Sequence, residues 1–284
     1  MEREQSGEAY GSGVHYDTSP EVFELVLDRN MNYSCAYYLR GDEDLDSGQE
    51  AKMQGIARRL ALKAGDRILD LGCGWCGPAL YFIEHFGCHV TGVTLSPVQR
   101  DYALAWAKRR GITTGLDVEV RDVMDLPYPP TSFNHILFLE SIIHMSQKDA
   151  LFARCYDLLK PGGRLFIQES HNNQGSRGSR YVSDPGFMEV NRAFGFTLHL
   201  VSGGEMLCHL EEAGLIPAYL EDISTHYQRT LSQWLDRIAT HAERIRSTSE
   251  HTYGMLRRYL LIALTTYRLA QTVCYQIVAQ RPAR

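Results

Sequence analysis

The sequence of 284 residues lacks several features that mark broad classes of protein. It has no excess of positive charge: 29 Lys and Arg stand against 34 Asp and Glu, which gives a formal net charge of -5. Nucleic acids and anionic membranes are bound by basic surfaces, so neither is expected as a main partner. No run approaches the roughly 18 apolar residues that cross a bilayer, and no apolar signal segment is recognisable at the N-terminus. We therefore predict a cytoplasmic protein without integral membrane association.

The seven cysteines do not form a recognisable framework. Their number is odd and they are scattered through expected core segments, so disulfides are not expected. Cys73 and Cys76 form a C-x-x-C pair, but no second Cys or His pair stands at the spacing of a zinc site. The sequence therefore predicts no metal site.

What the sequence does contain, from about Arg67 onward, is an alternation of short apolar runs and longer amphipathic stretches. The runs are RILDLG, HVTGVTL, DVEVRDV, NHILFLE and GRLFIQE, and TVCYQIVAQ follows near the end. Stretches 78–85, 96–110 and 148–159 have apolar residues at helical spacing. This alternation predicts an α/β fold with a Rossmann-like, doubly wound sheet. We expect that domain over 63–284, with lid insertions at about 172–202 and 225–269, and an N-terminal helical arm at 1–62 that covers the active site.

A glycine turn follows the first predicted strand. Gly72 and Gly74 let a ligand approach the backbone and the N-terminus of the next helix. Asp70 would repel a pyrophosphate but suits the ammonium group of an amino acid. The turn therefore favours S-adenosylmethionine over NAD as the cofactor.

Further cofactor contacts are expected at the ends of the second and third strands. The second strand ends without the usual acidic residue, so hydroxyl and amide groups would bind the ribose instead. Asp122 stands where an adenine edge would be read, although the same residue would also suit a simple turn cap. The residues assigned to the cofactor at these two places are Thr94, Leu95, Ser96, Gln99, Asp122, Val123 and Met124.

Four stretches of the chain resemble the cyclopropane fatty acid and mycolic acid synthases, a subclass of the S-adenosylmethionine-dependent methyltransferases. They are HYDTSPEVFELVLDRNMNYSCAYY, QEAKMQGIARRLALKAGDRILDLGCGWCGPALYF, VTGVTLSPVQRDYA and HYQRTLSQW. The similarity covers most of the chain, and YSCAY and GVTLSxxQ are marks of this subclass. The resemblance implies a methyltransferase with the seven-stranded sheet of that fold. It also implies that Tyr33 and Ser34 contact S-adenosylmethionine, and that Cys35, Glu140 and Tyr227 surround a bicarbonate ion acting as a base.

One position departs from the family pattern in a way that bears on the chemistry. The family has a histidine near the end of the fifth strand, whereas here Gln168 or Glu169 stands at that place. A changed base would alter the fate of the carbocation that forms when an alkene is methylated. Glu169 would remove a neighbouring proton and leave a methylated alkene. Cys76 also replaces a family glycine, with little expected consequence.

The segment SRGSRY at 176–181 bears on the acceptor. Its two guanidinium groups, hydroxyls and glycine describe a diphosphate clamp, or else a solvated loop. The region from FLES to LEEAGLIPAYLEDIS also resembles, more loosely, prenyl diphosphate C-methyltransferases. The favoured acceptor is therefore a C=C carbon of a hydrophobic small molecule, an isoprenoid or prenyl diphosphate such as isopentenyl diphosphate, with Mg2+ accompanying the diphosphate. Substrate contacts are assigned to Arg177, Arg180, Tyr181 and Phe196.

Aromatic side chains are available to surround a carbocation, although about half of them would simply belong to the core. They are Tyr16, Tyr33, Tyr37, Phe194, Phe196 and Tyr227.

Three alternative functions stay open. The first is a cyclopropane-forming synthase of unsaturated lipids. The second is an O- or N-methyltransferase of a specialised metabolite, with His144 beyond the fourth strand as the base. In the third, the cofactor is only a structural ligand, and the pocket catalyses a cyclisation or binds a metabolite. The sequence names neither the acceptor nor the oligomeric state, so a homo-oligomer also stays open.

Overall fold

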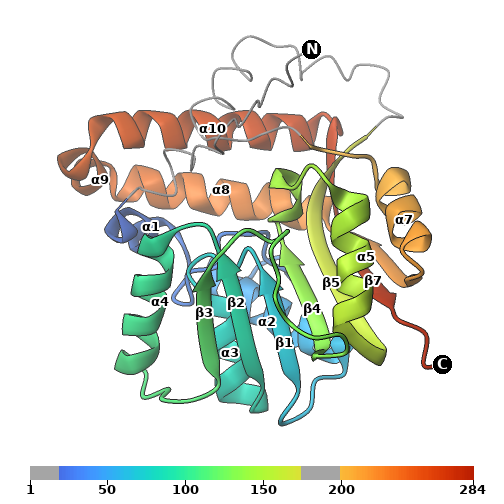
Figure 1. The fold of residues 1–284 in the computed structure, drawn as a ribbon. Coiled ribbons are helices and arrows are strands. Elements are labelled where there is room, and N and C mark those ends of the chain that lie inside the picture. The colour runs from blue at the N-terminus through green and yellow to red at the C-terminus, as the bar shows by residue number, and fades with distance from the viewer. Residues whose placement is uncertain (1–18, 174–198) are drawn as a thin grey trace, which may run out of the picture.

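The computed structural model describes residues 19–173 and 199–284, and its centre is a seven-stranded sheet (Figure 1). The strand order is β3-β2-β1-β4-β5-β7-β6, and β7 runs antiparallel to both of its neighbours. The predicted doubly wound α/β fold is confirmed. The strands are β1 (Arg67–Leu71), β2 (His89–Thr94), β3 (Leu116–Val120), β4 (Phe133–Leu139), β5 (Leu159–Asn172), β6 (Ile216–Asp222) and β7 (Thr272–Gln280).

Helices cover both faces of this sheet. Those between the strands are α3 (Gly77–Phe86), α4 (Pro97–Arg109), α5 (Lys148–Leu158) and α7 (Gly203–Glu212), and the short 3-10 helix η1 (Ile142–His144) follows β4. The bounds of α3, α4 and α5 lie within two residues of the stretches expected from helical spacing. Parallel strands buried between helix layers are continuously apolar, and residues such as Leu69, Ile136 and Phe166 are fully buried.

The apolar runs of the sequence did not predict the sixth strand. β6 reads IPAYLED, lies at the edge of the sheet and is largely exposed. An edge strand contributes little to the core, so it has no need of a continuous apolar run.

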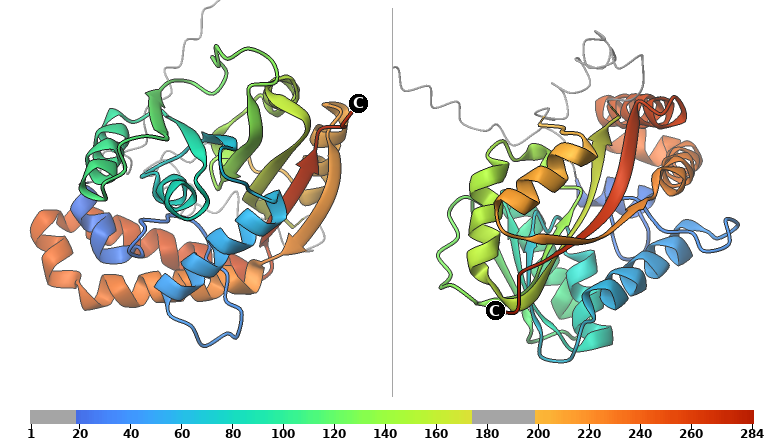
Figure 2. Two further views of the ribbon diagram at one scale, coloured as in Figure 1. Left: turned by 90° about the horizontal axis from the view of Figure 1, so that it is seen from below. Right: turned by 90° about the vertical axis from the view of Figure 1, so that its right-hand side faces the viewer.

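A second set of helices lies beyond the strand ends. It consists of α1 (Pro20–Val26), α8 (Ser224–Thr240), α9 (Ala242–Thr248) and α10 (Glu250–Arg268), whereas α2 (Leu45–Leu60) packs on a face of the sheet beside α3. Figure 1 shows α8 and α10 side by side above the carboxyl ends of the strands, and both views in Figure 2 keep them adjacent. An apolar cluster that includes Leu231, Ile238 and Leu260 joins these helices to α1. Among the described residues, no helix is long and apolar enough to cross a membrane.

Candidate active site

The glycine turn after β1 carries a buried carboxyl group without a partner. Asp70 is 1% exposed, and neither of its side-chain oxygens has a hydrogen-bond partner among the described residues. Burial raises the pKa of Asp70 to about 7, and the charge of Lys52 opposes that rise. A buried carboxylate needs a cationic partner, and the ammonium group of S-adenosylmethionine fits this requirement.

The two glycines of the turn have different surroundings. Gly72 has a φ of +85°, and a Cβ there would lie 2.3 Å from the Cβ of Ser141, so a side chain has no room. Gly74 has a φ of +51°, and a Cβ there would meet nothing within 4 Å. The turn is therefore packed against Ser141, just before η1, on one side and open at Gly74, which is the space that a ligand approaching the backbone requires.

At the end of β2 the predicted ribose contacts bind one another. Thr94 Oγ1 donates to Gln99 Oε1 at 2.7 Å, and Ser96 Oγ caps α4 by accepting from the backbone N–H of Gln99 at 3.3 Å. Leu95 between them is largely exposed. After β3, Asp122 Oδ1 accepts from the N–H of Met124 at 2.8 Å, which is the turn-capping contact anticipated as the alternative for this aspartate.

The arm segment with Tyr33, Ser34 and Cys35 is held by two buried side chains of α2 that sequence reasoning missed. Gln49 Nε2 donates to the carbonyl of Ser34, and Lys52 Nζ donates to Ser34 Oγ, both at 2.7 Å. Burial lowers the pKa of Lys52, while the carboxylates of Asp28 and Glu140 oppose this change. The available signal was their placement: both fall on the apolar stripe of α2 that also carries Met53, Ile56 and Leu60.

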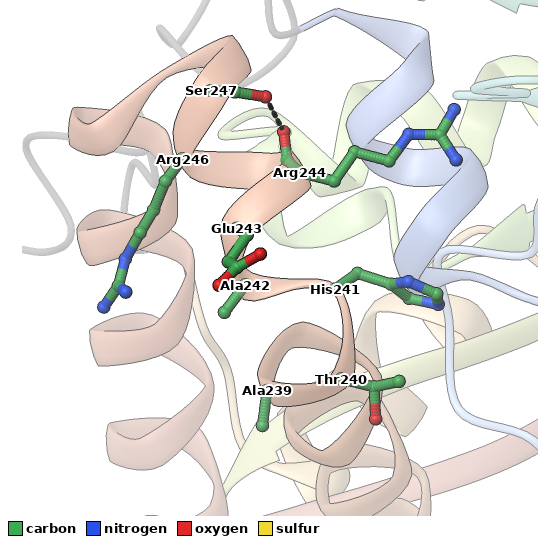
Figure 3. A pocket seen from close by; sticks show the side chains of 8 residues that line it. All are labelled: Ala239, Thr240, His241, Ala242, Glu243, Arg244, Arg246 and Ser247. Carbon is green, nitrogen blue, oxygen red and sulfur yellow. Dashed lines mark hydrogen bonds between the residues drawn. The ribbon is translucent and has the colours of Figure 1, made fainter.

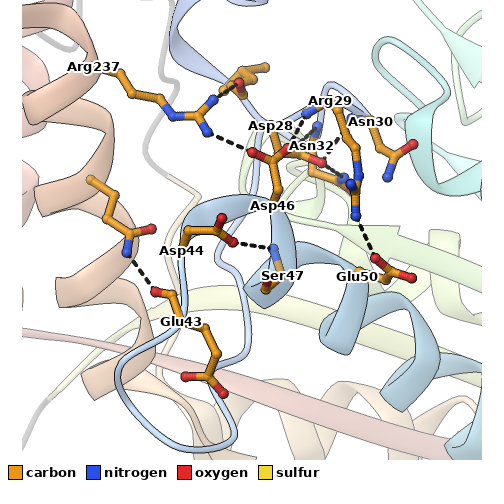
Figure 4. Close-up of polar contacts among 12 residues, drawn as sticks. Asp28, Arg29, Asn30, Asn32, Glu43, Asp44, Asp46, Ser47, Glu50 and Arg237 are labelled. Carbon is orange, nitrogen blue, oxygen red and sulfur yellow. Dashed lines mark hydrogen bonds and ion pairs between the residues drawn. The ribbon is translucent and has the colours of Figure 1, made fainter. Parts of the chain in front are cut away.

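Within the arm, the turn at 28–32, directly before Tyr33, is fixed by carboxylates (Figure 4). Asp28 accepts the backbone N–H groups of Asn30 at 3.0 Å and Asn32 at 2.7 Å. Asp46 at the start of α2 accepts the N–H of Arg29 at 2.6 Å and forms an ion pair with Arg237 of α8 at 2.8 Å. These contacts fix the position from which the arm enters the site.

Helix α8 binds the backbone of the arm through a row of side chains. His226 Nδ1 accepts the N–H of Tyr38 at 3.0 Å, and Thr230 Oγ1 accepts the N–H of Ala36 at 3.0 Å. Between them on the helix, Arg229 donates to the carbonyl of Glu43 at 2.6 Å. The motif HYQRTL therefore docks the arm over the ends of the strands.

Glu140, directly after β4, is the centre of the site. It is partly buried, and its φ of +58° is unusual for a side chain other than glycine. Its Oε1 accepts the N–H of Cys35 at 2.7 Å and Nε2 of Gln168 at 2.8 Å, while its Oε2 accepts the hydroxyl of Tyr227 at 2.5 Å. Burial raises the pKa of Glu140, whereas these three donors and the charge of Lys52 lower it. The structure thus brings together the three residues Cys35, Glu140 and Tyr227.

The structure shows which of the two β5 candidates for the place of the family histidine, Gln168 or Glu169, contacts Glu140. Side chains alternate between the faces of a strand, and Gln168 is the one that contacts Glu140. Glu169 accepts the N–H groups of Ser170 at 2.8 Å and Ile143 at 3.0 Å instead. Burial, and then the charge of Glu140, raise the pKa of Glu169 to about 8.

The chain belongs to the mycolic acid cyclopropane synthetase family. The model of that family matches residues 4–277, which is nearly the whole sequence.

Similar proteins agree with this placement. A probable fatty acid methyltransferase from Pseudomonas putida is 28% identical over 97% of this chain and 70% of its own length. The cyclopropane-fatty-acyl-phospholipid synthase of Escherichia coli K12 is 29% identical over 94% of this chain and 66% of its own length. The chain thus spans about two thirds of these relatives. A solved cyclopropane synthase from Mycobacterium tuberculosis has the same fold, with a TM-score of 0.86 and 23% identity over 95% of this chain and 96% of that one.

The family match and the relatives in sequence establish the general activity: the protein is an S-adenosylmethionine-dependent methyltransferase of the cyclopropane fatty acid synthase type. The unpartnered carboxyl of Asp70 suits the cofactor that this family uses.

Two further predicted site residues, His144 and Tyr37, are among the described residues, and several others lie outside the described parts of the chain. His144 ends η1 and is partly buried. Tyr37 stacks on His226 with ring centroids 4.5 Å apart. The proposed clamp and the remaining aromatic candidates lie outside the described residues, namely Tyr16, Arg177, Arg180, Tyr181, Phe194 and Phe196.

Two other features are separate from these residues. A hollow of about 750 Å³ lies at the corner between α8 and α9 (Figure 3), and it is lined by residues 239–244, 246 and 247, none of them a predicted site residue. On α5 and α7, the possible metal-ligand atoms of Asp149, His209 and Glu212 lie within 4.8 Å of one another. His209 also binds Asp149 directly, so this cluster links the two helices.

Proposed function

We propose that the enzyme transfers a methyl group to a C=C carbon of an unsaturated fatty acyl chain and then closes a cyclopropane ring. The observation that carries this proposal is the arrangement of Glu140: a carboxylate held by three donors, at the carboxyl end of β4, beside aromatic rings. An alkene is already a nucleophile and needs no base before it reacts. A base is needed afterwards, when the cation loses a proton.

The surroundings of Glu140 suit a hydrophobic acceptor. The ring of Tyr227 lies 4.7 Å from that of Tyr267 and 6.3 Å from that of Trp234, centroid to centroid. Tyr33 lies 5.4 Å from Trp234 on the other side. Such rings exclude water and present π faces to a cation.

The proposed reaction assigns a distinct step to each group. Bound S-adenosylmethionine supplies an electrophilic methyl group on a sulfonium. The π electrons of the alkene form the new C–C bond as the S–CH3 bond breaks, which leaves a cation on the neighbouring carbon. Loss of a proton from the added methyl group provides the electron pair that closes the ring. Glu140 accepts this proton on its carboxylate.

The contacts around Glu140 are our reason to propose the carboxylate itself, and not a bound bicarbonate, as the base. The N–H of Cys35, the amide of Gln168 and the hydroxyl of Tyr227 all donate to Glu140 itself. These donors are therefore engaged, and we route the proton to the carboxylate without an intervening ion.

We propose a lipid acceptor in place of the isoprenoid favoured from the sequence, because similar proteins are named for activities on fatty acids and their phospholipids. One is a probable fatty acid methyltransferase and another a synthase acting on fatty acyl phospholipids. No comparison supports a prenyl diphosphate, and Mg2+ was expected only as its companion.

The test is mass spectrometry of reactions with S-adenosylmethionine and three acceptors: vesicles of a monounsaturated phospholipid, vesicles of its saturated analogue, and isopentenyl diphosphate with Mg2+. We expect a methylene-extended acyl chain from the unsaturated lipid alone. A methylated diphosphate, with unchanged lipid, would overturn the proposal.

A further inference from the structure

A pair of glutamines lies behind Glu140 in the centre of the sheet. Gln168 of β5 and Gln276 of β7 stand directly opposite each other in the antiparallel register, and both are fully buried. Directly opposed residues project from the same face of a sheet. Gln276 Nε2 donates to Gln168 Oε1 at 2.8 Å.

This contact fixes which end of the Gln168 amide faces the active site. With Oε1 bound to Gln276, the amide nitrogen points at Glu140 Oε1, 2.8 Å away, and at the carbonyl of Cys35, 3.0 Å away. The NH2 group therefore uses both of its hydrogens on the site. An amide turned by 180° would place Oε1 against two acceptors and lose all three hydrogen bonds.

Packing alone does not account for the second glutamine. Buried amides destabilise a core unless both ends are bonded, and Gln276 Oε1 has no hydrogen-bond partner among the described residues. A leucine at this position would fill similar space without an unpartnered oxygen. The hydrogen bond from Gln276 to Gln168 is therefore the contact that can explain a glutamine at position 276.

We propose that Gln276 is a positioning residue of the methyl transfer: it orients the amide of Gln168, which in turn holds Glu140 and the arm at Cys35 in their reactive arrangement. This inference rests on the proposed function for its kinetic consequence. Neither amide changes charge between acidic and alkaline pH, so the two glutamines hold the proton acceptor without titrating. A histidine at position 168 would change charge near pH 6.5.

The test compares Gln276→Leu with Gln280→Leu. Gln280 lies on the same strand and the same face, but binds the carbonyl of Gly162 at the far end of the sheet. We expect Gln276→Leu to lower kcat about five- to tenfold, in line with one lost orienting hydrogen bond. KM for S-adenosylmethionine should stay within about twofold. The acid limb of the kcat profile should move to higher pH, because a carboxylate that loses a donor is protonated more easily. Gln280→Leu should change none of these.

A second comparison separates orientation from packing. In a Gln168→Leu background, Gln276→Leu should cause no further loss of kcat, because Gln276 acts only through Gln168. If Gln276→Leu folds poorly, Gln276→Met, which keeps the length of the side chain, replaces it. Equal kcat values and equal acid limbs for the position 276 and position 280 variants would overturn the proposal. So would a full additional loss in the double variant.

An infrared titration tests the orienting role of Gln276 without any methyl acceptor. The carboxyl band of Glu140 is identified by its absence in Glu140→Gln and is followed against pH in protein bound to S-adenosylhomocysteine, without any lipid. A higher midpoint in Gln276→Leu than in Gln280→Leu supports the orienting role even where the proposed lipid reaction has failed. Equal midpoints alongside normal lipid methylation would remove Gln276 from the site while leaving the proposed function intact.

Discussion

Asp70 and Glu140 are carboxylates at the ends of adjacent parallel strands, β1 and β4, and their surroundings are opposite. Asp70 is buried with no hydrogen-bond donor among the described residues, whereas Glu140 accepts three hydrogen bonds from the arm, β5 and α8. A buried charge must be compensated by either the protein or a ligand. The difference is the basis of our proposal that the cofactor compensates Asp70, while the protein itself prepares Glu140 to receive a proton.

The largest loss of activity is expected from Glu140→Gln. Removing the proton acceptor should lower kcat about a thousandfold, within the range of acid–base catalysis. The dissociation constant of S-adenosylmethionine should change by about twofold or less, because the cofactor binds elsewhere. Single-turnover kinetics and calorimetry measure the two quantities. Glu169→Gln is the matched control, since its carboxyl is bound by backbone N–H groups. A larger loss in that control would transfer the role of base to Glu169.

Asp70→Asn should produce the complementary effect. The variant loses the charge that pairs with the cofactor ammonium group, so the dissociation constant of S-adenosylmethionine should rise about a hundredfold. Asp122→Asn, at an exposed carboxylate that caps a turn, should raise it only slightly. Calorimetric titration of both variants decides the matter, and equal affinities would exclude Asp70 as the ammonium partner.

Lys52→Met should affect both carboxylates to a smaller degree. Lys52 binds Ser34, and its charge lowers the pKa values of both Asp70 and Glu140. We expect kcat/KM to fall about tenfold, and the acid limb of the pH profile to move to higher pH, because the carboxylates become easier to protonate. Lys63→Met, at an exposed position in the loop before β1, should leave the profile in place. An unshifted acid limb in Lys52→Met would contradict the electrostatic role.

The smallest effect concerns the stability of the protein without cofactor. Burial raises the pKa of Asp70 to about 7 and that of Glu169 to about 8, above their ordinary values of 3.8 and 4.5. The folded state therefore holds more protons than the unfolded state between those limits, and stability should fall as pH rises from about 5 to about 8. Melting temperatures across this range should fall by a few degrees, and by less in Asp70→Asn. A melting temperature that rises with pH in the wild type, or an equal slope in Asp70→Asn, would contradict the assignment.

The features that the sequence predicted are those with a local signal. Apolar runs predicted six of the seven strands, all but β6, and the glycine turn predicted the place of Asp70. The grouping of Cys35, Glu140 and Tyr227 came from family resemblance, because no local pattern connects residues about a hundred positions apart. Gln49, Lys52 and Gln276 escaped prediction for the same physical reason. Their roles depend on which residue lies opposite them after folding, and polar side chains in a buried stripe show only that some partner is needed.

The most direct test of the proposed ring closure uses S-adenosylmethionine whose transferred methyl group carries three deuterium atoms. With a monounsaturated phospholipid, the account predicts a cyclopropane acyl chain that retains two of the three, because Glu140 accepts the third as a deuteron. Mass spectrometry of the released acyl chains measures this retention. Retention of all three deuterium atoms in a methylated alkene would show that the proton leaves a neighbouring carbon, and would contradict ring closure at Glu140.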